Sequence, residues 1–241
     1  RHGQRFETEI VFDQLNQVDL SARPFRLTGD SAVYTCDALI VATGASARYL
    51  GMPSEQEFRG RGVSACATCD GFFYKNQKVA VIGGGNTAVE EALYLSNIAS
   101  EVTLVHRRDK LRAQDVLARQ LSDNNIPVLW DTEIKEIQGE ARVEGILVVN
   151  NKTGETSSVK TDGVFIAIGY TPAVELAEMM GLEINEDGYI KHDGKHRTNV
   201  PGVYSAGDVE GGYKQIVTAS GQGAEAAMTI FEDLINPYWL N

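Results

Sequence analysis

Two cysteines separated by two residues and followed by an acid form the part of the sequence best suited to chemistry. Cys66 and Cys69 form a C-x-x-C, and Asp70 follows directly. This spacing is typical of a redox dithiol, half of a zinc site or two buried thiols, and alone it does not decide among them. A carboxyl group beside a dithiol can act as a general acid or base when a thiolate leaves. Asp70 is also placed to cap a helix ahead of Phe72.

A zinc site would need four ligands. The remaining candidates are scattered along the chain: Cys36, His2, His106, His192 and His196. Because no second pair among them has ligand spacing, we predict no metal site and favour a redox dithiol.

A glycine-rich turn lies between a strand-like and a helix-like segment. Gly83, Gly85 and Ala88 fit G-x-G-x-x-A, with an apolar run at 79–82 before them and a helical pattern at 87–96 after them. Glycines at such a turn let backbone N–H groups approach a pyrophosphate, and the helix N-terminus adds positive potential. The motif alone is also found in structural turns, but this context favours a dinucleotide site.

Basic residues follow the next predicted strand. His106-Arg107-Arg108 begins 23 residues after Gly83, where an NAD-binding unit usually carries an acid, and Arg112 follows. Guanidinium groups suit a dianionic 2′-phosphate because each offers two parallel hydrogen bonds. The alternative is a solvated basic turn. In a chain of formal net charge −11 a basic cluster stands out, so we predict NADP rather than NAD.

Composition indicates a globular protein of one large or two smaller domains. The chain has 241 residues, of which 43% are hydrophobic, and it is too acidic overall to attract nucleic acid or anionic lipid. No apolar run approaches the roughly 18 residues of a membrane span, and no signal peptide opens the chain. We therefore predict a cytoplasmic protein that binds neither nucleic acid nor membrane. It starts at Arg1 without Met, so we expect a partial chain.

The pattern of elements predicts an α/β fold. From Lys78 it reads β-α-β-α-β, which implies a doubly wound, Rossmann-like parallel sheet. The strands of this unit are expected at 79–82, 102–105 and 128–129, and its helices at 87–96 and 114–122. An antiparallel meander at 134–137, 145–149 and 157–159 and a returning strand at 164–168 should follow. Outside this region we expect strands at 10–12, 24–27, 33–36 and 38–42, and a helix at 215–234.

Gly207-Asp208 follows a short apolar strand. A carboxylate there can bind the hydroxyls of a flavin side chain, while the helix that follows points N–H groups at the ring or phosphate. A plain turn is an equally good interpretation of the pattern itself.

These motifs together resemble thioredoxin reductase of the low-molecular-weight, two-domain type. The matching segments run along essentially the whole chain: Ala42-Thr43-Gly44-Ala45, Cys66 to Phe73, Gly83 to Ala88, His106 to Arg108 and Ala206-Gly207-Asp208. The resemblance implies an FAD domain formed by 1–46 and 172–241, with an NADPH domain, 47–171, inserted between them. It also implies that the NADPH domain rotates during turnover and that the enzyme is a homodimer.

The same resemblance implies the path of the electrons. Hydride passes from NADPH to FAD, and the electrons then reduce the Cys66–Cys69 disulfide, which in turn reduces thioredoxin. Cys69 would face the flavin, Cys66 would attack the substrate disulfide, and Asp70 would give and take the proton.

Binding residues are implied by the same match. The positions that match NADPH contacts, besides the glycine turn and the basic residues, are Asn86, Thr87, Glu90 and Ile168. The positions that match the flavin segment are Gly207, Asp208, Val209, Lys214, Gln215 and Ile216, and Thr43 matches a further cofactor contact. Phe72 and Phe73, otherwise expected in a core, match the surface that receives thioredoxin.

The chain departs from the family pattern in two places. The amino-terminal flavin motif is missing, and Lys214 stands where the family often has Arg. Tyr213-Lys214-Gln215-Ile216 resembles instead the flavoprotein that reduces a peroxiredoxin. The alternatives are therefore a reductase of a peroxiredoxin system, or a nucleotide-binding fragment that does not turn over.

Overall fold

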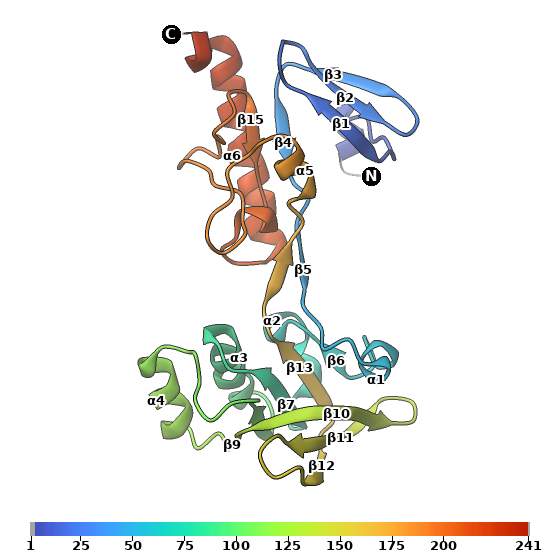
Figure 1. The fold of residues 1–241 in the computed structure, drawn as a ribbon, viewed down its shortest axis with the longest axis vertical. Coiled ribbons are helices and arrows are strands. Elements are labelled where there is room, and N and C mark those ends of the chain that lie inside the picture. The colour runs from blue at the N-terminus through green and yellow to red at the C-terminus, as the bar shows by residue number, and fades with distance from the viewer. Residues whose placement is uncertain (1–2, 241) are drawn as a thin grey trace. The chain divides into compact units, whose positions relative to one another are not determined.

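The computed structural model describes residues 3–240, so His2 lies outside the described part (Figure 1). The chain forms two compact units. The central unit is Ala47–Tyr170, and the split unit consists of Arg1–Ser46 with Thr171–Asn241. The functional names of the predicted domains are taken up below as a proposal.

A five-stranded sheet forms the middle of the central unit, with the order β6-β13-β7-β8-β9 and every neighbouring pair parallel. Its strands are β6 (Val63–Ser64), β7 (Lys78–Gly83), β8 (Glu101–Val105), β9 (Val128–Leu129) and β13 (Gly163–Ala167). Its helices are α1 (Pro53–Glu57), α2 (Ala67–Asp70), η2 (Gly71–Tyr74), α3 (Asn86–Ser96) and α4 (Asp115–Asp123). The predicted doubly wound succession is confirmed.

Successive side chains of β7 enter two different cores, as expected of a strand buried on both faces. Val79 and Val81 pack in a cluster with residues of α3 such as Val89, whereas Ala80 and Ile82 pack in another with apolar residues of the meander. The meander is β10 (Thr132–Gly139), β11 (Val143–Asn150) and β12 (Thr156–Lys160), paired antiparallel (Figure 1). The sheet is therefore covered on both sides.

The split unit contains an antiparallel sheet and a separate parallel strand pair. The sheet is β1 (Leu15–Asp19), β2 (Phe25–Gly29) and β3 (Val33–Cys36), and the pair is β4 (Leu39–Val41) with β15 (Val203–Ser205). Its helical elements are η1 (Gly3–Phe6), α5 (Glu175–Met179), η3 (Asp208–Glu210), α6 (Ile216–Ile235) and η4 (Tyr238–Leu240).

The strand predicted at 10–12 is wrong. Ile10, Val11 and Phe12 have no regular structure and are 52, 50 and 95% exposed. The first strand begins at Leu15 instead, where pairing with β2 is possible. A short apolar run forms a strand only when a partner strand and a buried face are available.

A further short strand, β14 (Tyr170–Pro172), pairs with β5 (Ala45–Ala47). Both strands lie where the chain passes between the two units. Over residues 3–240, no helix is long and apolar enough to cross a bilayer.

Candidate functional site

The predicted chemical groups of the central unit gather at one edge of its sheet. All five strands run in the same direction, so their carboxyl ends meet at that edge. The dithiol segment follows β6, the glycine turn follows β7, the basic run follows β8 and Ile168 follows β13. In open α/β sheets this is the edge at which ligands bind.

Cys66 and Cys69 form a disulfide, with their Cα atoms 5.3 Å apart. Cys66 is the N-cap of α2, and its Sγ accepts a hydrogen bond from the backbone N–H of Cys69 at 3.2 Å. Cys69 is exposed, whereas Cys66 is half-buried. The pair is thus a surface disulfide, rather than half of a zinc site or two buried thiols.

Asp70 is held beside this disulfide by a serine. The hydroxyl of Ser64 donates to Oδ2 of Asp70 at 2.6 Å and accepts from the backbone N–H of Cys66 at 3.1 Å. Asp70 stands at the N-cap position of η2, but its side chain makes no capping bond. The carboxyl group is therefore oriented toward the dithiol segment by Ser64, a residue that the sequence analysis missed.

A second carboxyl group, also missed, lies behind the dithiol helix. Oε1 of Glu91, on α3, accepts from the backbone N–H of Ala67 at 3.4 Å, and Oε2 is buried with no hydrogen-bond partner among the described residues. Burial raises the pKa of Glu91 to about 7. A carboxyl group that changes charge near neutral pH next to a dithiol is typical of a functional site.

Phe72 and Phe73 lie on the surface just after the dithiol. They are 73% and 74% exposed, so they are not core residues. Two adjacent exposed aromatic side chains are suited to contact a protein partner.

The glycines of the turn after β7 differ in what a side chain at each position would contact. A Cβ on Gly83, whose φ is +156°, would lie 2.3 Å from the carbonyl oxygen of Ala167 and 2.6 Å from Cβ of Ala88. A Cβ on Gly84 would overlap the ring of His106. Gly85, the N-cap of α3, faces open space, so the backbone there is accessible to a ligand.

A cleft of about 470 Å³ opens beside this turn. The predicted residues that line it are Gly83, His106, Arg107, Arg108, Arg112 and Ile168. The other lining residues were not predicted. Ile82, Gly84, Val105 and Ala167 adjoin predicted site residues, and the rest come from segments without a motif: Arg48, Leu50, Met52, Thr132, Glu133 and Ile134.

Four predicted nucleotide residues do not line this cleft: Gly85, Asn86, Thr87 and Glu90. They form the first turns of α3, where Asn86, Thr87 and Glu90 are exposed. Oδ1 of Asn86 accepts from the backbone N–H of Gln114 at 2.9 Å, which ties the start of α3 to the segment before α4.

The basic residues of the cleft differ in burial. His106 is 5% exposed, packs edge-on against Trp130 and contacts the carbonyl oxygen of Lys110 through Nε2 at 2.9 Å. Arg107 and Arg108 are exposed, and within residues 3–240 neither forms a salt bridge with a carboxylate. Two guanidinium groups without acidic partners fit an anionic phosphate.

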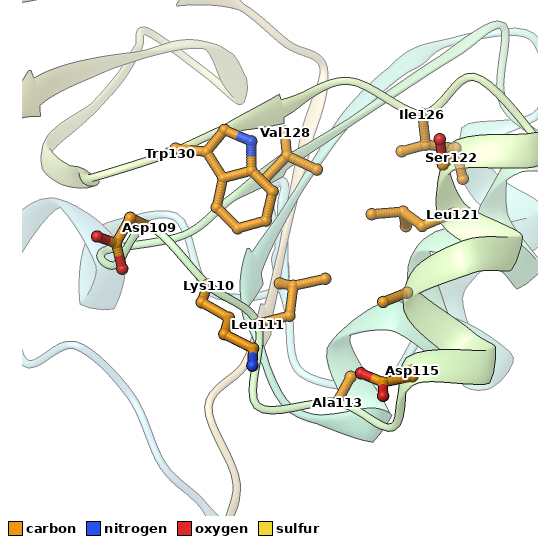
Figure 2. Close-up of a pocket in the computed structure, with 11 residues that line it drawn as sticks. Asp109, Lys110, Leu111, Ala113, Asp115, Leu121, Ser122, Ile126, Val128 and Trp130 are labelled. Carbon is orange, nitrogen blue, oxygen red and sulfur yellow. The ribbon is translucent and has the colours of Figure 1, made fainter.

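A different cleft, of about 390 Å³, lies between the 109–113 segment, α4 and β9 (Figure 2). Leu111, Leu121, Val128 and Trp130 project toward it (Figure 2). None of the predicted site residues lines it, so it is not part of the site.

The predicted flavin segment lies in the split unit. Gly207 has a φ of +83°, and its N–H donates to Oε1 of Gln222 at 3.0 Å. The side chain of Val209 is fully buried, so only its backbone could meet a cofactor. Lys214 stacks over the ring of Tyr189 at 4.7 Å. Thr43 donates to the carbonyl oxygen of Ala173 at 2.5 Å.

The start of α6 fits a flat, partly polar ligand such as a flavin. Tyr213, Ile216 and Val217 are 86, 88 and 79% exposed, and the helix N-terminus has no side-chain cap from Gln215. Apolar surface next to uncapped N–H groups suits an aromatic ring with acceptor atoms at its edge.

Comparisons with known proteins agree with this geometry. Residues 3–223 match the family model described as pyridine nucleotide-disulphide oxidoreductase. The thioredoxin reductase of Escherichia coli O157:H7 is 54% identical over 239 residues, which are 94% of this chain and 74% of that protein. This chain belongs to the thioredoxin reductase family.

A solved structure supports the same assignment. The thioredoxin reductase of Streptococcus pyogenes MGAS5005 superposes with a TM-score of 0.86 at 38% identity, and the match covers 96% of this chain and 76% of that one. One relative in Pseudomonas fluorescens, 53% identical over 94% of this chain and 73% of its own length, is named glucosaminate ammonia-lyase.

Membership of the thioredoxin reductase family gives the activity of this chain. The chain is an oxidoreductase that acts on a sulfur group: it reduces thioredoxin with NADPH by way of FAD. The residues of both units described above fit these two cofactors.

Proposed function

We propose that the Cys66–Cys69 disulfide is the redox centre of this thioredoxin reductase. The observation that carries the proposal is the disulfide itself, formed at the carboxyl edge of the sheet with Asp70 fixed beside it by Ser64. Two electrons and two protons convert this disulfide to two thiols. FAD, when bound, supplies the electron pair that it has received from NADPH as hydride.

In this proposal the two cysteines have different tasks. The thiolate of Cys66 attacks the disulfide of thioredoxin to form a mixed disulfide, and the departing thioredoxin sulfur takes a proton from Asp70. Cys69, which would face the flavin, then attacks Cys66 Sγ, which re-forms the Cys66–Cys69 disulfide and releases reduced thioredoxin. Exposed Phe72 and Phe73 would contact the incoming thioredoxin or thioredoxin-like protein.

We propose the central unit as the NADPH domain and the split unit as the FAD domain. In the first, Gly83, Gly85, Asn86, Thr87 and Glu90 would bind the nucleotide along the turn and α3. The ring of His106, which packs against Gly84, would support the turn. Arg107, Arg108 and Arg112 would bind the 2′-phosphate, and Ile168 would line the cleft. In the second, FAD would be held by Thr43, Gly207, Asp208, Val209, Lys214, Gln215 and Ile216.

We infer a homodimer and a cytoplasmic location. Met228, Phe231 and Ile235 of α6 are 65, 64 and 60% exposed, which supports a further protein surface against this helix. Thioredoxin keeps thiols reduced in the cytosol, which supports that compartment. Sedimentation analysis that gives the mass of a single chain would contradict the dimer.

The decisive experiment changes each cysteine separately. Cys66→Ser and Cys69→Ser should each abolish NADPH-dependent reduction of thioredoxin, while NADPH still binds. Cys36→Ser is the matched control, because Cys36 is a free, half-buried thiol of the split unit and burial raises its pKa. Full activity in either of the first two variants would refute the proposed redox centre.

The nucleotide assignment has its own test. Arg108→Gln should raise the KM for NADPH about tenfold and leave that for NADH nearly unchanged, because a charged hydrogen bond to phosphate contributes roughly 1.5 kcal/mol or more. Arg119→Gln, an exposed arginine of α4, is the control. An equal loss with both nucleotides would contradict a 2′-phosphate site.

A peroxiredoxin-system reductase is the second candidate, favoured by Lys214 and the residues around it. Assays of wild type with thioredoxin and with a peroxiredoxin-linked thioredoxin-like domain separate the two, since the preferred substrate will have the higher kcat/KM. The lyase activity suggested by the name of the Pseudomonas fluorescens relative can be assayed in parallel. Ammonia release from glucosaminate that persists in Cys66→Ser would indicate that this activity is separate from the dithiol.

A further inference from the structure

Two histidines and a glutamate converge in the split unit, beside the turn that carries Asp208. One nitrogen each of His192 and His196 and one carboxylate oxygen of Glu210 all lie within 4.8 Å of one another. Glu210 ends η3, and the histidines belong to the turn before β15. Both histidines were named from the sequence, but no metal site was predicted there because Glu210 was not considered as their partner.

The two distances from the histidines to the glutamate bracket the ligand spacing of a metal coordination shell. Nδ1 of His196 lies 3.0 Å from Oε2 of Glu210, and Nδ1 of His192 lies 3.6 Å from Oε1. Ligands about 2.0 to 2.1 Å from a tetrahedral zinc are about 3.3 Å apart, which falls between these two distances. Two imidazoles and one carboxylate are also a donor set that zinc uses in proteins.

The prospective ligands have the outer partners that metal ligands need. Nε2 of His196 faces Oε2 of Glu225 on α6 at 3.1 Å, as in a carboxylate–histidine–metal arrangement. The hydroxyl of Ser205 donates to Oε1 of Glu210 at 2.5 Å. These bonds fix the orientation of His196 and Glu210, both of which are buried.

The backbone is also held in an uncommon conformation here. His196 has a φ of +65°, in the left-handed region that residues with a side chain rarely adopt. Its carbonyl oxygen accepts from the N–H of Ser205 at 3.1 Å, which fixes the turn to β15. A buried imidazole is thereby directed at Glu210.

Access comes from the side of His192, whose side chain is 30% exposed. Its ring is stacked on that of His196, and its Nδ1 now contacts the carbonyl oxygen of Asp193 at 2.7 Å. A bound metal ion would replace the contact between Nδ1 of His192 and Asp193, and water would complete the coordination shell of the ion from the solvent side.

We propose that His192, His196 and Glu210 form a binding site for a divalent transition-metal ion of the zinc class, with Glu225 and Ser205 as outer-shell partners. A bound ion would join the histidine turn to the turn that carries Asp208. This site is independent of the dithiol, so it stands or falls separately from the proposed redox centre.

The test is calorimetric titration of the full chain with Zn²⁺ in a buffer without reductant, so that the Cys66–Cys69 disulfide stays intact. Wild type should bind one ion per chain. His192→Asn should weaken binding at least tenfold, and Glu225→Gln should weaken it about tenfold, the usual effect of losing an outer-shell partner. Both side chains are partly or largely exposed, so these variants should fold.

Two controls separate this site from others. Glu186→Gln removes an exposed carboxylate of the same unit, and Cys36→Ser removes the free thiol that remains while the Cys66–Cys69 disulfide is intact. Both should bind Zn²⁺ like wild type. The proposal is overturned if wild type binds no Zn²⁺, if His192→Asn binds it unchanged, or if the cysteine variant abolishes binding.

Discussion

The two units differ in the partners of their buried carboxyl groups and in the direction in which the pKa of each is shifted. In the split unit, Asp233 accepts from Arg197 at 2.6 and 2.7 Å and from the hydroxyl of Tyr204 at 2.7 Å. The hydrogen bonds from Arg197 hold the pKa of Asp233 below its ordinary value. In the central unit, Glu91 has no basic partner among the described residues, and burial moves its pKa up.

This difference separates structural charges from reactive ones. A buried carboxylate with a bidentate arginine stays ionised and fixes neighbouring elements, here β15 and α6, because breaking the pair leaves a charge without a partner. An unpaired carboxyl group near a dithiol can instead change its protonation at physiological pH. We therefore expect substitutions at Asp233 to affect stability at all ordinary pH values, and those at Glu91 to act in a pH-dependent way.

The largest effect on stability is expected from Asp233→Asn. It should lower the free energy of unfolding of the split unit by about 3 kcal/mol, since Arg197 then loses its charged partner. Denaturant unfolding followed by the fluorescence of Trp239, in a Trp130→Phe background, reports on this unit. Glu232→Gln is the control: its ion pair with Lys195 is exposed, so a change below about 0.5 kcal/mol is expected. Equal losses of stability in the two variants would mean that the buried pair contributes no more to stability than the exposed one.

Glu91→Gln should stabilise the central unit at high pH. The pKa of Glu91 is about 7 in the folded chain against an ordinary value of 4.5, so the folded state binds more protons between these values and wild type loses stability as pH rises through them. The variant should match wild type near pH 4 and exceed it by about 3 kcal/mol at pH 8. Unfolding followed by Trp130 fluorescence measures this.

The neighbouring exposed glutamate gives the control for that experiment. Glu90→Gln removes a carboxyl group one residue earlier on α3 and should leave the pH dependence of unfolding as in wild type. If Glu91→Gln retained the wild-type slope between pH 4 and pH 8, Glu91 would not be the titrating group.

The smallest effect is expected at the serine that orients Asp70. Ser64→Ala removes a hydrogen bond of about 1 kcal/mol and should lower kcat for thioredoxin reduction about fivefold, with NADPH affinity unchanged. Ser96→Ala, which removes a hydroxyl bonded to the carbonyl of Leu93 on α3, should leave kcat unchanged. An unaffected kcat in Ser64→Ala would mean that Asp70 does not depend on this contact.

Local patterns predicted much of the central unit. The strands and helices around Gly83 and Arg107 follow from periodicity and turn residues, and their ends in the structure lie within one residue of the predicted ends. These features depend on residues that are near one another in sequence.

Ser64, Glu91 and Glu210 could not be predicted in this way. Each is an ordinary polar residue outside any motif. Glu91 and Glu210 take their roles only when folding brings α3 to Ala67 and η3 to His196, whereas Ser64 lies six residues from Asp70 and depends on how the chain turns after β6. The error at 10–12 has a related cause, because the apolar side chains there have no partner strand within residues 3–240.

The setting of Cys36 has a consequence for covalent labelling. Burial raises the pKa of this thiol, so the reactive thiolate is scarce at neutral pH. After mild reduction of the disulfide, an alkylating reagent applied briefly at pH 7 should therefore add two groups to the native chain, and a third only after denaturation. Intact mass spectrometry of the labelled chain would thus count the redox thiols directly and report whether the split unit has opened.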